Sequence, residues 1–178
     1  GYLPASYANT TLAQDGARHI VPELPADRLY LGTGIAATAD GVESATATGP
    51  GDGVVRPSGE RWQAGATGAL TVTASGAGLL WGWFDWNHDG IFGEGEAQDL
   101  GTVVTGTQSV AVAIGSGYSH ALPLFARFRL YLPGFSLSFE DTGVVYNGEV
   151  EDFAWHMIRG TVFDDLNGDA IQDLGDTG

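Results

Sequence analysis

The hydrophobic residues of this chain occur in short alternating runs, and glycine-rich stretches separate the runs. Alternation with a period of two is typical of half-buried β-strands. No long stripe with the 3.6-residue period of a helix is present. Eight short strands with turns at close spacing predict an all-β fold, an antiparallel β-sandwich of the jelly-roll or immunoglobulin-like kind with little helix. The expected strands lie near residues 28–33, 68–74, 78–86, 99–104, 108–114, 124–132, 150–158 and 160–163.

Two stretches break this pattern. Residues 36–56 are small, polar and rich in glycine, so a long surface loop is expected there. Any helix is limited to a turn or two near Ala64 or Leu12. Asn9 begins an Asn-Thr-Thr sequon. It is a candidate glycan site in an organism that glycosylates asparagine, and otherwise part of an ordinary surface segment.

The charge balance narrows the range of partners. The chain has 22 acidic and 7 basic residues, with a formal net charge of −15. This balance argues against nucleic acid, which needs a basic footprint, and against anionic membrane surfaces. No apolar stretch approaches the roughly 20 residues that span a bilayer, so no membrane insertion is expected. The absence of cysteine excludes disulfides and thiolate metal sites, which leaves divalent cations bound by oxygen as the natural partners.

One acidic loop matches a calcium-binding pattern at every specific position. The run FDWNHDGIFGEGE at 84–96 fits D-x-[DN]-x-[DN]-G-x5-E. Oxygen ligands at this spacing suit a hard cation with six to eight ligands, and the closing glutamate can bind through both oxygens. Calcium is therefore favoured over magnesium, and the alternative is an Asn-Asp-Gly turn with solvated acids. The expected ligands are the side chains of Asp85, Asn87, Asp89 and Glu96 and the backbone carbonyl of Ile91.

A second loop of the same kind, DLNGDAIQDLGD, follows at 165–176. Its match is weaker, because Ala170 replaces the usual glycine and the closing residue is a shorter aspartate. Together the two loops predict two calcium ions. The expected ligands of the second are Asp165, Asn167, Asp169, Ile171, Asp173 and Asp176.

The motif NGEVEDF at 147–153, together with the FDWNHDGIFGEGE loop and GARH…LYLG at 16–32, resembles the GEVED domain of bacterial secreted and surface proteins. The resemblance runs through nearly all of residues 1–158. The tail GTVFDDLNGDAIQDLGD is similar to the start of the calcium-binding B modules of serine–aspartate repeat adhesins. These resemblances imply an extracellular or cell-surface β-sandwich that binds calcium. Two departures from the family pattern leave open any additional metal site: only GPGDGVV remains of the usual acidic run, and GYLPASYAN lacks the aspartates common at the N-terminus.

The GEVED motif itself is better explained by ion pairs than by metal binding. Arg127 and Arg129 share one strand face, and Glu149 and Glu151 share one face of the following strand. If these strands pair, two arginine–carboxylate rungs form side by side, with Asp152 in the same segment. The alternatives are calcium ligation by Glu149 or Asp152, and partner binding.

The sequence bears on three kinds of function. Catalysis is not expected, because the sequence has no G-x-S-x-G elbow, H-E-x-x-H helix or P-loop. A carbohydrate-binding or adhesive role would need exposed aromatic rings, although tryptophans in a sandwich more often belong to the core. A non-enzymatic structural module is favoured, either a subunit of a surface filament or a module of a surface adhesin. The tryptophans that could bind a glycan are Trp62, Trp81, Trp83, Trp86 and Trp155.

Two segments are expected, a GEVED-like sandwich over residues 1–158 and a strand with a calcium loop over 159–178. In the adhesin modules it resembles, RGTVF opens a complete sandwich, but no further strands follow it in this sequence. A lone strand leaves its ladder hydrogen bonds unsatisfied. We therefore expect it to join a sheet edge of a neighbouring copy, which gives a homo-oligomer or filament. The alternatives are a segment that folds back on its own domain and a fragment of a longer adhesin.

Overall fold

The computed structural model describes residues 3, 7, 16–35, 52–135 and 140–155. In this part of the chain almost every regular element is a β-strand. The elements are β1 (Arg18–Ile20), the 3-10 helix η2 (Pro25–Asp27), β2 (Val54–Val55), β3 (Thr67–Ala74), β4 (Gly78–Phe84), β5 (Ala97–Val103), β6 (Gly106–Ala113), β7 (Leu124–Tyr131), β8 (Val144–Tyr146) and β9 (Glu149–Trp155).

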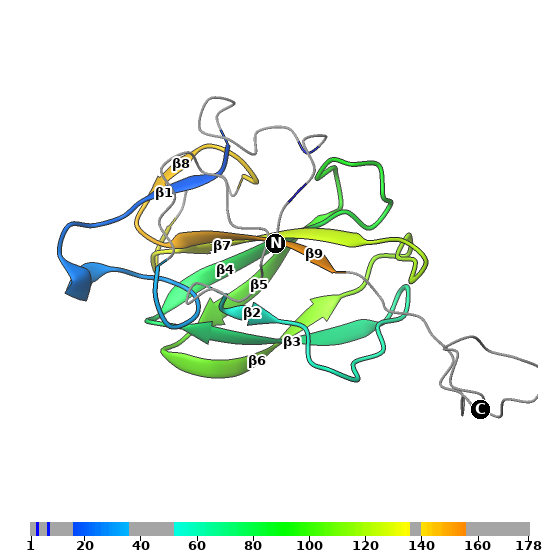
Figure 1. The fold of residues 1–178 in the computed structure, drawn as a ribbon, viewed down its shortest axis with the longest axis horizontal. Coiled ribbons are helices and arrows are strands. Elements are labelled where there is room, and N and C mark those ends of the chain that lie inside the picture. Colours follow the sequence, from blue (N-terminus) through cyan, green and yellow to red (C-terminus); the bar gives the residue numbers. More distant parts are fainter. Residues whose placement is uncertain (1–2, 4–6, 8–15, 36–51, 136–139, 156–178) are drawn as a thin grey trace, which may run out of the picture.

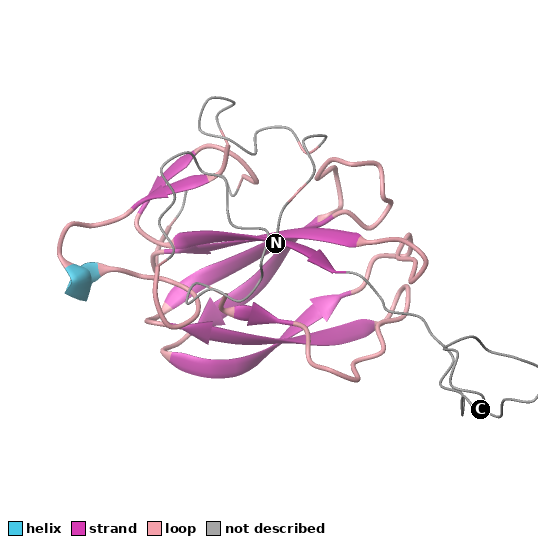
Figure 2. Ribbon diagram, viewed as in Figure 1, coloured by secondary structure: helices cyan, strands magenta, loops and turns pink. Residues whose placement is uncertain are grey.

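Two antiparallel sheets face each other and form a sandwich (Figures 1 and 2). One sheet has four strands in the order β5-β4-β7-β9, and the other has three in the order β2-β3-β6. The predicted all-β sandwich is confirmed. A third sheet lies beside the four-stranded one and consists of β1 and β8, which run parallel. This parallel pair is a departure from the purely antiparallel arrangement that was expected.

Alternating side chains build the core between the two large sheets. In β3, Leu70, Val72 and Ala74 are buried, while the residues between them are half-buried. In β6, Val110 and Val112 take the same inward positions. The alternation follows from the pleat of a strand, which directs successive side chains to opposite faces. The period-two pattern of the sequence therefore marks the faces that meet in the core.

Six of the eight predicted strands correspond to β3, β4, β5, β6, β7 and β9, with ends shifted by a few residues. The strand predicted at 28–33 is wrong, because only a single bridge between Leu31 and Ala74 forms there. Leu29 and Leu31 are nevertheless buried, so their alternation marks an extended segment and not a ladder strand. Side chains accept three of its hydrogen bonds: Asn147 from the N–H of Leu29, Ser75 from that of Tyr30, and Glu149 from that of Leu31. The N–H of Gly32 donates to the backbone carbonyl of Thr73.

The prediction missed three strands of two or three residues, β1, β2 and β8. Such short strands carry too few residues to reveal a period, and β2 lies inside the loop expected at 36–56. The helix expected near Ala64 is a turn instead, and the short helix occurs at η2, where Pro25 supplies a favourable first residue. No helix in the described ranges is both long enough and apolar enough to span a membrane.

Candidate metal centre

The acidic loop begins where β4 ends and closes where β5 begins. Two hydrogen bonds hold its ends to the sandwich. The N–H of Phe84 donates to the carbonyl of Glu96 at 3.0 Å, and the N–H of Asp85 donates to the carbonyl of Phe125 in β7, also at 3.0 Å. The first and last acids of the loop are thereby fixed on neighbouring strands.

Three acids of the loop come together. One carboxylate oxygen from each of Asp85, Asp89 and Glu96 lies within 4.8 Å of the others. Asp85 is 1% and Glu96 4% exposed, whereas Asp89 is exposed. Asn87 is exposed beside them and donates from its amide to Asp89 at 2.9 Å. Ile91, whose carbonyl is the remaining expected ligand, has an exposed side chain, so its backbone lies at the surface end of the loop.

Backbone N–H groups orient the two buried carboxylates. Asp85 accepts from the N–H groups of Asp89 and Gly90, each at 3.1 Å. Glu96 accepts from Trp86 at 2.9 Å and Asn87 at 3.4 Å through one oxygen, and from Gly93 at 2.7 Å through the other. His88 and Gly90 have φ of 60° and 87°, a left-handed geometry that turns the chain around the acids.

In the described part of the chain, these acids have no positively charged partner. Among the described residues, neither ion pairs nor hydrogen bonds connect an arginine to Asp85, Asp89 or Glu96. The neutral hydroxyl of Tyr7 donates to Asp85. Burial raises the pKa of Tyr7, and burial together with the negative charge of Asp85 raises the pKa of Glu96. Converging, partly buried carboxylates without a cation fit an oxygen-liganded divalent ion, which would remove their repulsion.

A pocket of about 370 Å³ adjoins the loop, and Tyr7, Asp85, His88 and Phe125 are among the residues that line it. His88 does not point freely into solvent, since its Nδ1 lies 3.1 Å from the carbonyl of Pro123. Its Nε2 is buried and has no hydrogen-bond partner in the described part of the chain. The acidic loop is therefore packed against the turn before β7 as well as against β5.

Arg127 makes the predicted kind of carboxylate contact with the GEVED segment, but with Asp152 and not with Glu149 or Glu151. Arg127 forms a two-pronged ion pair with Asp152, with Nε and Nη2 donating to the two oxygens at 2.7 and 2.8 Å. These two residues are direct neighbours in the β7–β9 register and so lie on the same sheet face. Arg127 also donates to the carbonyl of Asp141 at 2.7 Å, so it joins the sheet to the segment before β8.

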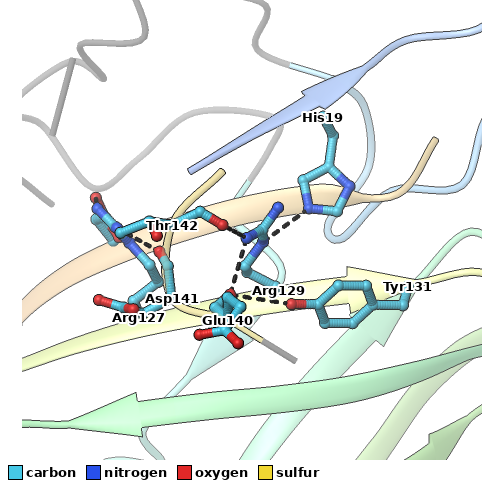
Figure 3. Close-up of polar contacts among 8 residues, drawn as sticks. His19, Arg127, Arg129, Tyr131, Glu140, Asp141 and Thr142 are labelled. Carbon is cyan, nitrogen blue, oxygen red and sulfur yellow. Dashed lines mark hydrogen bonds and ion pairs between the residues drawn. The ribbon is translucent and has the colours of Figure 1, made fainter. Parts of the chain in front are cut away.

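The second predicted ion pair is wrong. Arg129 faces Val150 in the register, and its guanidinium binds backbone carbonyls instead of a carboxylate (Figure 3). Its Nε donates to Nε2 of His19 at 3.2 Å, and His19 holds the carbonyl of Asn147 through Nδ1 at 2.5 Å. Burial and the adjacent Arg129 charge lower the pKa of His19 to about 3. The carbonyls that Arg129 binds belong to Arg18, Glu140, Thr142 and Gly143.

Glu149 and Glu151 point to the opposite face from the arginines, because they pair with Leu130 and Phe128. They are 9% and 2% exposed. Glu149 accepts from the N–H of Leu31 at 2.5 Å. Glu151 accepts from Gly53 at 2.7 Å and Val54 at 3.2 Å, at the start of β2. The two glutamates thus tie β9 to segments outside its own sheet.

The glycine of the motif is required by the backbone. Asn147 and Gly148 have φ of 60° and 85°. A Cβ on Gly148 would lie 1.9 Å from the carbonyl oxygen of Leu130 and 2.9 Å from Nδ1 of His19. The motif therefore combines a tight turn, two inward carboxylates and one outward carboxylate.

The tryptophans do not form an exposed platform. Trp62, Trp83 and Trp86 are 1–4% exposed, and Trp81 and Trp155 are half-buried. Trp62 meets Trp86 and Trp155 with ring centroids 6.1 and 5.6 Å apart, in an aromatic cluster of the core. Their principal contribution is to packing.

Three contacts of the site were not predicted, those made by Tyr7, His19 and Asn147. Tyr7 lies 78 positions from Asp85 in the sequence, and His19 lies 110 positions from Arg129. Neither residue belongs to a recognisable motif with its partner, so the local sequence does not predict the contact. Three predicted features lie outside the described residues: Asn9, the strand at 160–163 and the whole second loop. The ligands predicted in that loop are Asp165, Asn167, Asp169, Ile171, Asp173 and Asp176.

The chain is thus an all-β sandwich with an acidic loop mounted between two strands of its larger sheet. Residues 80–155 match the family model of the GEVED domain, which confirms that resemblance for this part of the chain. The matched segment contains the acidic loop and nearly all of the four-stranded sheet. No curated protein and no solved structure matches the chain.

Proposed function

We propose that this protein is a non-enzymatic, calcium-stabilised structural module of an extracellular surface assembly, a filament subunit or part of an adhesin. The observation that carries the proposal is the convergence of Asp85, Asp89 and Glu96, two of them buried, with no arginine to neutralise them in the described ranges. A binding loop placed between β4 and β5 couples the ion to the sheet. Its occupation therefore favours the folded state by mass action.

An extracellular location is part of the same proposal, because extracellular modules are the class of loop-bound calcium sites with the weakest affinities. Modules of this kind bind calcium with dissociation constants of roughly 10⁻⁴ to 10⁻³ M, so they fill only where calcium is abundant. The surplus of acids suits a solvated, secreted chain, and two bound ions would add four positive charges to the net −15. Assembly through residues 159–178 is part of the proposal and rests on the strand character of RGTVF.

Calcium dependence is measured by thermal melting with 10 mM calcium or with EGTA. From the dissociation constants above, calcium at this concentration adds about 1.4 to 2.7 kcal/mol, or roughly 3 to 10 °C in melting temperature. The variant Glu96→Gln should lose most of this gain, because it removes a buried ligand charge. Glu94→Gln is the matched control, since Glu94 is an exposed acid of the same loop.

Two results would contradict the calcium site: identical melting curves with calcium and EGTA, or equal calcium responses for the Glu96→Gln and Glu94→Gln variants. A glycan-binding role has less support, because three of the five tryptophans are buried.

A further inference from the structure

The strand β8 has an open edge. Its ladder to β1 uses the carbonyl of Gly143, which accepts from Arg18, and the N–H of Asn147, which donates to Ile20. Because successive residues of a strand direct their backbone groups to opposite sides, Val144 and Tyr146 turn theirs away from β1. Within the described ranges β8 pairs with no other strand. Two residues of β8 thus present N–H and C=O groups that a further strand could bind.

An apolar groove of about 460 Å³ runs beside this edge. Tyr131 and Phe135 stack in its wall with ring centroids 4.6 Å apart. Leu132, Val144 and Tyr146 also line it and are 37%, 51% and 61% exposed. A strand with one open edge next to exposed apolar side chains is the arrangement that binds extended peptides by strand addition.

Side chains occupy parts of two other sheet edges. Gln98 in β5 exchanges two hydrogen bonds with the backbone of Ala113 in β6, at 2.7 and 2.9 Å, and so closes the gap between those strands. The carboxylate of Glu151 occupies the N–H groups of Gly53 and Val54 where β2 begins. The β8 edge has no such protection among the described contacts.

We propose that the β8 edge and its groove accept residues 161–163 of a second copy of this chain as an added strand. Thr, Val and Phe at these positions have high strand propensity. The stretch 156–163 contains one arginine, one histidine and no acid, in a chain of net charge −15. Glu140, exposed at the groove, gives Arg159 a partner of opposite charge.

For residues 161–163 of the same chain to fill the groove, the link from the end of β9 would have to be almost fully extended. Trp155 pairs with Leu124 at one end of β7, whereas the groove lies at Tyr131, seven residues or about 23 Å along that strand. Figure 1 shows the end of β9 on the other side of the molecule from β8. A fully extended link carries residue 161 at most about 21 Å and residue 163 about 28 Å from Trp155, so only a nearly straight path across the sandwich would place this segment in its own groove. A second copy meets no such limit.

This inference rests on the proposed assembly and names the surface that accepts the strand. The experiment therefore tests the β8 acceptor separately from assembly itself. The chain has no cysteine, which makes engineered disulfides unambiguous. One full-length copy carries Tyr146→Cys, and another carries Thr161→Cys, Val162→Cys or Phe163→Cys. The copies are mixed in calcium and oxidised, and non-reducing gels detect the joined pair. Light scattering of the unmodified chain measures assembly independently.

At least one of the three mixtures should give about tenfold more joined pair than a mixture in which Val104→Cys replaces Tyr146→Cys, because docking raises the local thiol concentration. Val104 is a fair control, since it is 55% exposed and lies between β5 and β6. Assembly with no excess over this control would overturn the β8 acceptor and leave the proposed assembly standing. A monodisperse unmodified monomer would overturn both. A disulfide formed within single monomers of the double variant Tyr146→Cys/Val162→Cys would overturn donation between copies.

Discussion

At the scale of single residues, the side chain of Glu151 takes the place of a strand carbonyl. Its two oxygens accept from two successive N–H groups, those of Gly53 and Val54, in a site where the side chain is 2% exposed. A buried carboxylate is costly unless each oxygen is satisfied. Here each has its own donor, so the charge joins the two sheets of the sandwich.

The variant Glu151→Gln should therefore destabilise the fold by about 1 to 3 kcal/mol, because the new amide NH₂ meets one of the two N–H donors and leaves it unsatisfied. Urea unfolding gives this free energy. Glu23→Gln is the control, since Glu23 is exposed and its substitution should change the free energy by less than about 0.5 kcal/mol. Equal stabilities for the two variants would show that the Glu151 contacts contribute nothing.

At the scale of elements, His19 and Arg129 attach the β1–β8 pair to the four-stranded sheet. Arg129 projects from β7, contacts His19 of β1 (Figure 3), and binds the carbonyls of Arg18 in β1 and Gly143 just before β8. His19 in turn holds the carbonyl of Asn147. With Nε2 accepting from arginine and Nδ1 donating, the imidazole is neutral. A proton on Nε2 would place two cations together and remove the acceptor.

This geometry predicts destabilisation by acid. The folded pKa of His19, about 3, lies below the ordinary value of 6.5, so the unfolded chain binds the extra proton. The His19 contribution to stability is therefore complete above about pH 6.5 and declines as the pH falls toward 3. Glu96 and Asp141 act in the opposite sense, because burial raises their pKa values.

Because these carboxylates titrate in both proteins, the difference in stability between the wild-type chain and the His19→Gln variant reports the contribution of His19 alone. The free energy of unfolding of the wild-type chain should fall relative to that of the variant between pH 7 and pH 4.5. Chemical denaturation at both pH values measures the difference. A difference that stays constant with pH would refute the neutral His19 bridge.

At the scale of the whole molecule, charge and edges decide how the protein behaves in solution. The net charge of −15 keeps separate copies apart. The proposed calcium binding would lower that repulsion, and the proposed docking surface lies at the β8 edge. The proposed contact joins two different surfaces of the subunit, so each added copy leaves a free surface for the next. Chains of subunits result unless the rotation between copies closes them into a ring.

Deletion of residues 159–178 should abolish assembly in calcium. The calcium-dependent gain in melting temperature from the first loop should remain, because that loop is held by β4, β5 and β7. Analytical ultracentrifugation and melting of the same samples measure both effects. Unchanged sedimentation after the deletion would refute donation, and a lost calcium response would place the stabilising ion in the second loop.

The sequence alone determined the strands with clear alternation and the acids of the first loop, because both depend on local spacing. Residues two apart share a strand face, and Asp85, Asp89 and Glu96 are brought together by one turn of a short loop. The partners of the GEVED motif depend on register instead. A shift of one residue exchanges the faces of a strand, so only the β7–β9 pairing decided that Asp152 meets Arg127 while Glu149 and Glu151 face inward. The same holds for β1 and β8 and for His19 beside Arg129, since contacts across more than 100 residues arise from packing and leave no trace in local sequence.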